Sequence, residues 1–355
     1  MNERILVINP GSTSTKLALF VEDRQEWKES ISHTAAELSR FPTINDQLEF
    51  RRDLVLAALE EHNEPLSGLA AVVSRGGNLP PVHTGAYLVD EYLCEALRDR
   101  PVDQHAANIG AAIALQLAEK AGVHAYIYDA LTVDEMDPVN TVTGLRGVRR
   151  PARGHNLNTR AAALHYCAEN GKDYNSSTVI VAHLGGGITV NLHKNGRMCD
   201  VVMDEEGPFS PERAGGLPVY SVVDMCFSGE YDKKSLMKHL QRAGGLLDWF
   251  GTGDLQELEV LMDEGDEEVA LVYEAMALNT AKAIGRLAVT AKGSVDAIVL
   301  TGGMACSSLL PGKIAEYCGW IAPVVIIPGE NEMNALAEGT LRVLRGEETA
   351  DLFRG

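Results

Sequence analysis

Short apolar runs alternate along this chain with longer segments in which apolar residues recur every three or four positions. The first run, residues 5–8, is followed by Asn9-Pro10-Gly11, four hydroxyl residues, Lys16 and a second run at 17–21. Two such runs joined by a Gly/Ser/Thr turn predict a β-hairpin. Glycine lets backbone N–H groups approach an anion closely, so the tip is either an ordinary polar turn or a phosphate-type loop.

A second copy of this pattern favours the phosphate-type loop. Residues 179–193, VIVAHLGGGITVNLH, align with the first hairpin without a gap, so that Asn9 matches His183 and Gly11 matches Gly185. A turn and a third β-like strand follow each copy, at residues 25–31 and 197–203. The repetition predicts two related hairpins rather than one chance motif.

The parallel extends beyond the hairpins. Residues 70–77 and 296–303 are both apolar strands that end in Gly-Gly. Each is followed by a helical stretch and another apolar strand with acids close behind it, Asp129 in the first half and Glu330 and Glu332 in the second. The same order of elements in both halves predicts a duplicated α/β fold, with the two loops facing each other across a cleft.

Helical spacing of apolar residues predicts the main helices. They are expected over residues 35–62, 109–121, 158–169, 267–291 and 335–344. The chain of 355 residues is long enough for about two domains, and its 45% hydrophobic and 23% charged residues are typical of globular proteins.

Charge and cysteine usage exclude several classes of function. With 31 basic against 50 acidic residues, the net charge of −19 argues against nucleic acid or an anionic membrane surface as the main partner. An anionic substrate stays possible, because a few arginines can reverse the local potential. None of the six cysteines forms a CxxC pair, and no apolar run reaches transmembrane length, so we expect a cytoplasmic protein with free thiols.

Two arginines precede Gly-Gly turns. Arg75 comes at a predicted strand tip just before Gly76-Gly77, and Arg213 lies in a turn-rich segment before Gly215-Gly216. Either arginine alone could form a surface salt bridge, but two of them beside two phosphate-type loops favour anion binding. Asp129 ends a predicted strand, the position at which open α/β sheets bind ligands.

Two histidines stand at predicted helix starts. His105 lies one turn before Asn108, and His155 follows a segment rich in Gly and Arg. A helix N-terminus favours an anionic ligand, although local capping and packing explain His105 equally well. A lone histidine is more often structural, and the basic segment raises the case for His155 modestly.

Taken together, these motifs resemble the acetate and butyrate kinase family, and its butyrate branch in particular. The motifs that carry the resemblance occur in the family's order: VINPGSTSTKLALF, SRGG, QHAANIGA, HLGGGI, GPFSPERAGGLP and LTGG. The resemblance implies two duplicated ribonuclease H-like (actin-like ATPase) domains with mixed five-stranded sheets flanked by helices, and an active site in the interdomain cleft. We expect residues 1–155, completed by the C-terminal helix 335–355, to form one domain and residues 156–334 to form the nucleotide-binding domain.

The resemblance also implies roles for individual residues. Arg75 and Arg213 match the two arginines that hold the carboxylate and the phosphoryl group. Asp129 matches the essential acid, and His155 matches the histidine near the phosphoryl oxygens. Matches to the substrate and phosphate loops are Ser12, Ser14, Lys16, His105, His183, Gly185, Gly186 and Gly187. Gly302 and Gly303 match the adenosine side. Asn9 and Glu332 match the positions for Mg²⁺, with Glu330 an open alternative for the metal.

The family implies reversible, ATP-dependent phosphorylation of a short-chain carboxylate such as butyrate, with ATP and Mg²⁺ as cofactors and a homodimer or higher homo-oligomer as the assembly. An acetate, propionate or branched-chain acid kinase shares this chemistry. A nucleotide-switch protein of the same superfamily is the alternative from another class, and a sugar kinase is a minor one. No GxxxxGK[ST] or GxGxxG pattern supports a P-loop kinase or a Rossmann dehydrogenase.

Overall fold

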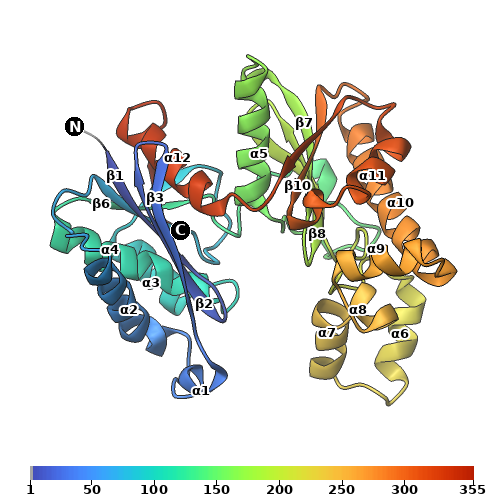
Figure 1. Ribbon diagram of the computed structural model, residues 1–355, viewed down its shortest axis with the longest axis horizontal. Helices are drawn as coiled ribbons and strands as arrows, with labels where there is room; N and C mark the ends of the chain where they lie inside the picture. Colours follow the sequence, from blue (N-terminus) through green and yellow to red (C-terminus); the bar gives the residue numbers. More distant parts are fainter. Residues whose placement is uncertain (1–2) are drawn as a thin grey trace. The chain divides into compact units, whose positions relative to one another are not determined.

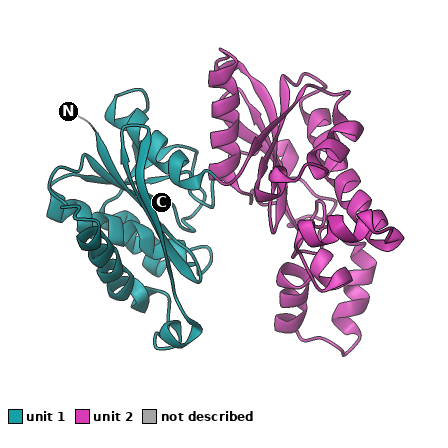
Figure 2. Cartoon of the chain, in the orientation of Figure 1, with its two compact units in different colours: residues 1–134, 331–355 teal, residues 135–330 magenta. Residues whose placement is uncertain are grey.

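Two β-sheets, one of seven strands and one of five, organise the described part of the chain (Figure 1). The computed structural model describes residues 3–355. Its tertiary contacts divide it into unit 1, residues 1–134 with 331–355, and unit 2, residues 135–330 (Figure 2). None of the helices within residues 3–355 is both long and apolar enough to cross a membrane.

Unit 1 has the strand order β12-β5-β6-β4-β1-β2-β3. Helix α4 packs against β4 and β6, while α12 packs against β1. Its elements are β1 (Arg4–Pro10), β2 (Ser14–Val21), β3 (Arg24–Ser32), α1 (Ala35–Leu38), η1 (Asn45–Gln47), α2 (Leu48–Glu61), β4 (Ala71–Arg75), β5 (Ala86–Leu88), α3 (Glu91–Asp99), η2 (Ala106–Ile109), α4 (Gly110–Ala121), β6 (His124–Tyr128), α12 (Glu332–Leu344) and β12 (Asp351–Leu352).

Unit 2 has the strand order β11-β10-β7-β8-β9. The long helix α10 packs against β7, β8 and β9 and forms much of the core. The elements are η3 (Pro138–Thr141), α5 (Asn156–Glu169), η4 (Tyr174–Ser176), β7 (Thr178–Leu184), β8 (Ile188–Lys194), β9 (Arg197–Val202), α6 (Val219–Phe227), α7 (Lys233–Arg242), α8 (Leu246–Phe250), α9 (Leu255–Asp263), α10 (Glu267–Thr290), β10 (Ala297–Gly302), η5 (Gly303–Cys306), α11 (Leu310–Cys318) and β11 (Val324–Pro328).

The predicted duplication is confirmed by the strand orders. The run β6-β4-β1-β2-β3 of unit 1 has the same connectivity as β11-β10-β7-β8-β9 of unit 2. In both units the hairpin pairs antiparallel, and the strand that ends in Gly-Gly runs parallel to the first strand of the hairpin. A register shift interrupts the pairing with the third strand in both units, at Leu19/Phe20 and at Leu192/His193.

Two details of unit 1 differ from the sequence-based prediction. Its sheet has seven strands rather than five, because the short strands β5 and β12 extend the edge beyond β6. The single helix predicted over residues 35–62 is wrong, since α1 ends at Leu38 and α2 begins at Leu48. Pro42 explains the break, because the residue before a proline is disfavoured in helical conformation.

The domain boundaries also differ from the predicted ones at 155 and 335. Residues 135–155 belong with unit 2, where Arg150 Nη1 donates to Asp200 Oδ1 (3.1 Å) and the Asp137 N–H donates to the Cys199 carbonyl (3.0 Å). Residues 331–334 belong with unit 1. Helix α12 begins at Glu332, and the Asn331 carbonyl accepts a hydrogen bond from the Ala335 N–H. The first difference comes from contacts between segments about 50 residues apart, and the second from the point at which α12 begins.

Candidate active site

The carboxyl ends of three neighbouring parallel strands bring predicted site residues together in unit 1. Ile8 of β1 pairs with Ser74 of β4, and Arg75 of β4 pairs with Tyr128 of β6. Asn9, Arg75 and Asp129 therefore follow one another along the same edge of the sheet. In parallel sheets this is the edge at which ligands bind.

A carboxylate from α12 completes the group at this edge. Asn9 Nδ2 donates to Glu332 Oε2 (2.8 Å), and Arg75 Nη1 lies 3.0 Å from Glu332 Oε1. Arg75 and Glu332 keep only 17% and 15% of their side-chain surface exposed, so the ion pair is largely shielded from water. The Nε of Arg75 is buried and has no hydrogen-bond partner among residues 3–355.

Asp129 is held in a strained conformation at the end of β6. Its φ angle is 41°, in the left-handed region that few non-glycine residues adopt, and its side chain is buried. Oδ1 accepts a hydrogen bond from the Gly85 N–H (2.8 Å), while the Asp129 N–H donates to the Gly85 carbonyl (3.1 Å). The carboxylate therefore helps to fix the segment before β5.

His105 caps the short helix η2 instead of pointing freely into solvent. Its Nδ1 accepts a hydrogen bond from the Ala107 N–H (3.1 Å), so the neutral ring carries its proton on Nε2. Burial, followed by the nearby Arg75 charge, lowers the pKa of His105. Asn108 has a structural role, because it accepts from the Asn78 N–H and donates to the Asp103 carbonyl. The sequence left anion binding and local capping open for His105, and the structure shows the cap.

The tip of the first hairpin forms a tight loop. The Gly11 N–H donates to the Ser14 carbonyl (2.7 Å), and Ser12 and Thr13 are exposed at the tip. Lys16 lies opposite Asn9 in the β1–β2 register. The hydroxyl groups and the lysine predicted for this loop are therefore close to the carboxyl edge of the sheet.

Two stacked histidines form the corresponding group in unit 2. The rings of His155 and His183 lie 3.8 Å apart and nearly parallel. Asn158 Nδ2 donates to His183 Nδ1 (2.8 Å), which places the proton of a neutral His183 on Nε2, 3.6 Å from a Glu330 oxygen. His155 Nδ1 lies 3.0 Å from the Thr189 hydroxyl.

The second phosphate-type loop is packed against the segment that carries Arg213. A Cβ atom on Gly187 would lie 2.6 Å from the guanidinium carbon of Arg213, so a larger residue here would displace the end of the Arg213 side chain. Arg213 Nη1 is 2.6 Å from Asp204 Oδ2. The Gly186 carbonyl accepts hydrogen bonds from the Ser210 hydroxyl (2.7 Å) and the Glu212 N–H (3.2 Å). The loop and Arg213 are thus fixed as one structural element.

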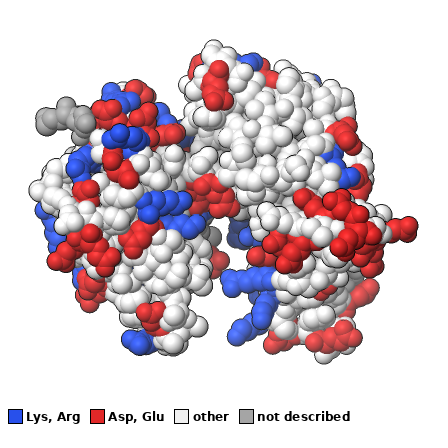
Figure 3. Space-filling view, viewed as in Figure 1, with Lys and Arg blue, Asp and Glu red and all other residues white. Residues whose placement is uncertain are grey.

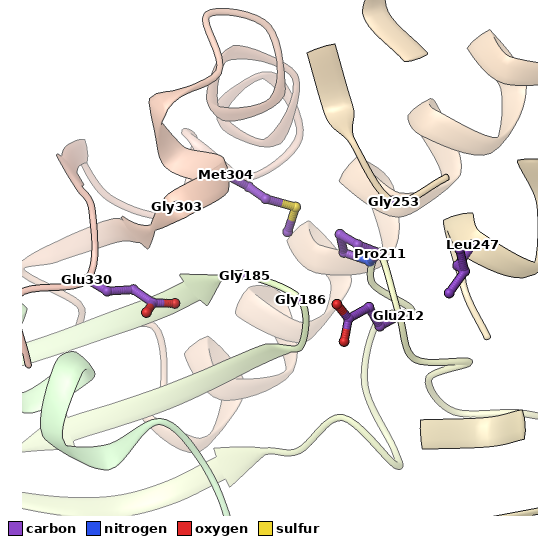
Figure 4. A pocket seen from close by; sticks show the side chains of 9 residues that line it. All are labelled: Gly185, Gly186, Pro211, Glu212, Leu247, Gly253, Gly303, Met304 and Glu330. Atoms are coloured by element: carbon purple, nitrogen blue, oxygen red, sulfur yellow. The ribbon is translucent and has the colours of Figure 1, made fainter. Parts of the chain in front are cut away.

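A cavity of about 450 Å³ opens beside this loop, within the size range of small-molecule sites (Figure 4). The carboxylates of Glu212 and Glu330 border it, and the Met304 side chain reaches toward it. Gly303 has open space around its Cα, whereas a Cβ atom on Gly302 would lie 2.3 Å from the Leu184 carbonyl oxygen. The lining residues are Gly185, Gly186, Pro211, Glu212, Leu247, Gly253, Gly303, Met304 and Glu330.

The donor set of unit 1 fits a magnesium ion that retains much of its water. Mg²⁺ prefers oxygen ligands and is usually bound through one or two carboxylates together with substrate phosphates. Glu332 supplies carboxylate oxygens, and the Asn9 side chain, which carries one amide oxygen, lies beside it with Nδ2 donating to Oε2. Within residues 3–355, no group of three or more His, Cys, Asp or Glu side chains could hold a metal by itself. Glu330 lies in unit 2, where its Oε1 is 3.6 Å from His183 Nε2.

Part of the chain matches a known protein family, and its fold matches solved structures. Residues 155–310 match the acetokinase family. Acetate kinase from Porphyromonas gingivalis has the same fold, with a TM-score of 0.78 and 18% identity over 95% of this chain and 99% of that chain. Acetate kinase from Entamoeba histolytica (TM-score 0.76, 17% identity over 95% of this chain and 99% of that chain) also shares the fold. So does a propionate kinase from Francisella tularensis (TM-score 0.73, 16% identity over 95% and 98%).

The family match covers most of the candidate residues in unit 2. His155, His183 and Arg213 lie within residues 155–310, as do the second loop and Gly302-Gly303. The structural similarity confirms the predicted α/β fold for nearly the whole chain. Asn9, Arg75, Asp129 and Glu332 lie outside the matched segment, and their grouping comes from the structure itself.

Several residues of the site were not found from the sequence. Asn158 orients His183 from the first turn of α5, and Glu212 and Met304 line the cavity. A signal existed for Glu212, because it directly precedes Arg213. Nothing in the sequence pattern marks Met304, which is indistinguishable from a core residue until the strand and the loop are placed.

Proposed function

We propose that this chain is a short-chain carboxylate kinase of the acetokinase family. It would transfer the γ-phosphoryl group of ATP directly to a carboxylate, forming an acyl phosphate and ADP reversibly. The observation that carries the proposal is the family match, joined to the placement of two arginines. Arg75 ends β4 at the carboxyl edge of the unit 1 sheet, 3.0 Å from Glu332, and Arg213 packs against Gly187 of the second phosphate-type loop.

The chemistry explains why arginines matter more than a base. A carboxylate is already ionised at neutral pH, so the acceptor needs no deprotonation. The obstacle is repulsion between two anions, and the planar guanidinium group binds carboxylate or phosphate through two parallel hydrogen bonds. Arg75 and Arg213 would neutralise the acceptor and the transferring group. Phosphoryl transfer then depends mainly on alignment and electrostatic stabilisation.

The remaining candidates would support these arginines. His155 and His183 would donate hydrogen bonds to phosphoryl oxygens, together with Ser12, Ser14, Lys16 and the Gly185–Gly187 loop. Asp129 would orient its surroundings instead of acting as a base, since it accepts the Gly85 N–H. Glu332 and Asn9 would hold Mg²⁺, which lowers the negative charge on ATP phosphates. The cavity beside Gly303 would take the adenosine part of ATP.

Butyrate is the acid that we propose as substrate. Support comes from Asn9-Pro10-Gly11 and the Pro211-Glu212-Arg213-Ala214-Gly215 segment, which resemble the butyrate branch of the family. Acetate, propionate or a branched-chain acid is the alternative acceptor. A nucleotide-switch role is disfavoured, because it gives no reason for the two arginines.

We further propose that the protein assembles with a second copy through α6. This helix of nine residues has no buried residue, and Val219, Tyr220, Val223 and Phe227 are all exposed, Phe227 to 86%. Clusters of exposed apolar residues of this kind mark interaction surfaces. Basic residues gather beside α7 and acidic residues along α9 and the start of α10 (Figure 3). Two copies related by a twofold axis could pair these opposite charges around an apolar centre.

The reverse reaction provides a direct test of the proposed chemistry. The purified protein is incubated with synthetic butyryl phosphate, ADP and Mg²⁺, and ATP is measured. Formation of ATP that requires all three components would support the proposal. A protein that binds ATP yet makes none from butyryl, propionyl or acetyl phosphate would refute it and favour the nucleotide switch.

A further inference from the structure

Arg51 is the largest side chain without exposed surface among the residues that the structure describes. It lies in α2 and reaches the loop at the tip of the first hairpin. Nη1 donates to the carbonyls of Gly11 (2.8 Å) and Ser14 (3.1 Å) and to the Thr15 hydroxyl (3.1 Å). Nη2 donates to the Ser12 carbonyl (3.4 Å). One guanidinium group therefore binds most of the loop.

The positive charge of Arg51 has no carboxylate partner within ion-pair distance among residues 3–355. Its remaining contacts are from Nε (3.1 Å) and Nη2 (3.0 Å) to Oε1 of Gln47, a neutral acceptor that is itself buried. Burial lowers the pKa of Arg51 to about 10, so the group is still charged at neutral pH. An unpaired buried charge is costly, because the protein replaces water poorly as a solvent for it.

The hydrogen bonds also determine which way the loop faces. Carbonyls of Gly11, Ser12 and Ser14 point toward Arg51, and the Thr13 carbonyl accepts from the His33 N–H (2.8 Å). Within the described residues, nothing accepts a hydrogen bond from the backbone N–H of Ser12 or Thr13, and both residues are exposed. With their carbonyls bound on the protein side, successive N–H groups are left available for an anion.

We infer that Arg51 is a positioning residue that orients the Gly11–Thr15 loop and supplies the buried positive charge favouring a phosphoryl oxyanion there. This inference deepens the proposed function, because the ligand is a phosphate group of the same reaction. It predicts that an anion in the loop relieves part of the cost of the buried charge. Phosphate should therefore stabilise the folded protein.

The neighbour of Arg51 offers a test that leaves the fold nearly unchanged. Gln47→Glu has almost the same shape, and its carboxylate would sit where Nε and Nη2 of Arg51 already donate. The new ion pair would cancel the charge of Arg51 while keeping its contacts with the loop. Gln116→Glu is the matched control, since Gln116 Oε1 accepts from Arg52 Nη1 (3.1 Å) away from the loop.

Thermal unfolding is measured with increasing inorganic phosphate, against potassium chloride at equal ionic strength. For Gln47→Glu we expect a Tm without phosphate at least as high as that of wild type. Its affinity for phosphate should be about tenfold weaker, a loss of about 1.4 kcal/mol. Gln116→Glu should respond to phosphate as wild type does. If Arg51 had only a structural role, Gln47→Glu would not both raise the Tm and weaken the affinity for phosphate.

Arg51→Lys separates charge from geometry. Lysine keeps the charge but lacks the fork that holds three carbonyls, so kcat should fall while phosphate still raises the Tm. Equal phosphate responses of Gln47→Glu and Gln116→Glu would overturn the inference. The comparison of phosphate responses does not depend on catalysis. The inference can therefore fail although acyl phosphate is made, and it can be tested although no acyl phosphate forms.

Discussion

Replacing Arg75 by methionine tests the electrostatic account of the reaction. Methionine keeps an apolar stem in the space of the arginine while removing the charge and all five donors. The structure places the Arg75 guanidinium 3.0 Å from Glu332, at the carboxyl edge of the unit 1 sheet. Two unit charges about 4 Å apart at an effective dielectric constant of about 20 interact by about 4 kcal/mol. Since 1.36 kcal/mol corresponds to a factor of ten in rate, kcat should fall about 10³-fold.

The fold should survive this substitution. Glu332 keeps its hydrogen bond from Asn9 and about 15% of its side-chain surface in water, so losing its charged partner should cost about 1–3 kcal/mol of stability. Arg354→Met is the control, because Arg354 pairs with Asp90 (2.7 Å) in the same unit without contacting the candidate site.

The assay is initial-rate acyl phosphate formation at saturating ATP and acid, accompanied by circular dichroism melting curves. Arg75→Met should lose activity and keep a cooperative transition, while Arg354→Met should keep its activity. A folded Arg75→Met enzyme with kcat within about threefold of wild type would refute the reasoning.

Three further predictions concern the cavity, pH and assembly. Gly303→Val should raise the KM for ATP at least tenfold with little change in Tm. Gly302→Ala should instead destabilise the fold by about 1–3 kcal/mol, because the φ angle of Gly302 is 95° and a Cβ atom there would meet the Leu184 carbonyl. Equal melting temperatures for the two variants would contradict this difference. Burial lowers the pKa of His193 to about 3, so the unfolded state binds a proton that the folded state does not, and stability should fall as the pH drops from about 6.5 toward 3. Urea unfolding at several pH values should show a shallower loss for His193→Gln, and parallel curves would exclude His193 as the cause. Phe227→Asp places a charge on the exposed apolar face of α6 and should give monomers in sedimentation velocity, unlike wild type; an unchanged sedimentation coefficient would exclude this face as the interface.

The duplicated fold was predictable because its signals are local. The runs at residues 5–8 and 179–182 are continuous and apolar, as strands buried on both faces must be, and each ends at a glycine-containing turn. Strands β5 and β12 left no such signal. They contain three and two residues, too few for any periodicity. The two strands pair with each other although they lie more than 250 residues apart in the sequence.

The candidate site was predictable where residues stand next to turns and unpredictable where they act across the fold. Arg75 and Arg213 precede Gly-Gly turns, which the sequence displays directly. Arg51 lies inside a predicted helix, and no spacing rule shows that its charge faces a loop nearly 40 residues earlier. Glu330 and Glu332 are two positions apart but lie in different units, because the chain passes from β11 to α12 between them.

The most direct test of the central claim is trapping of the acyl phosphate with hydroxylamine. The protein is supplied with ATP, Mg²⁺ and, one at a time, acetate, propionate, butyrate, isobutyrate and valerate, and the hydroxamate is quantified. The account predicts ATP-dependent hydroxamate with a maximum at butyrate, and a maximum at acetate or propionate would keep the chemistry and change the substrate. Absence of hydroxamate with every acid, from a folded protein that binds ATP, would contradict the assignment as a carboxylate kinase.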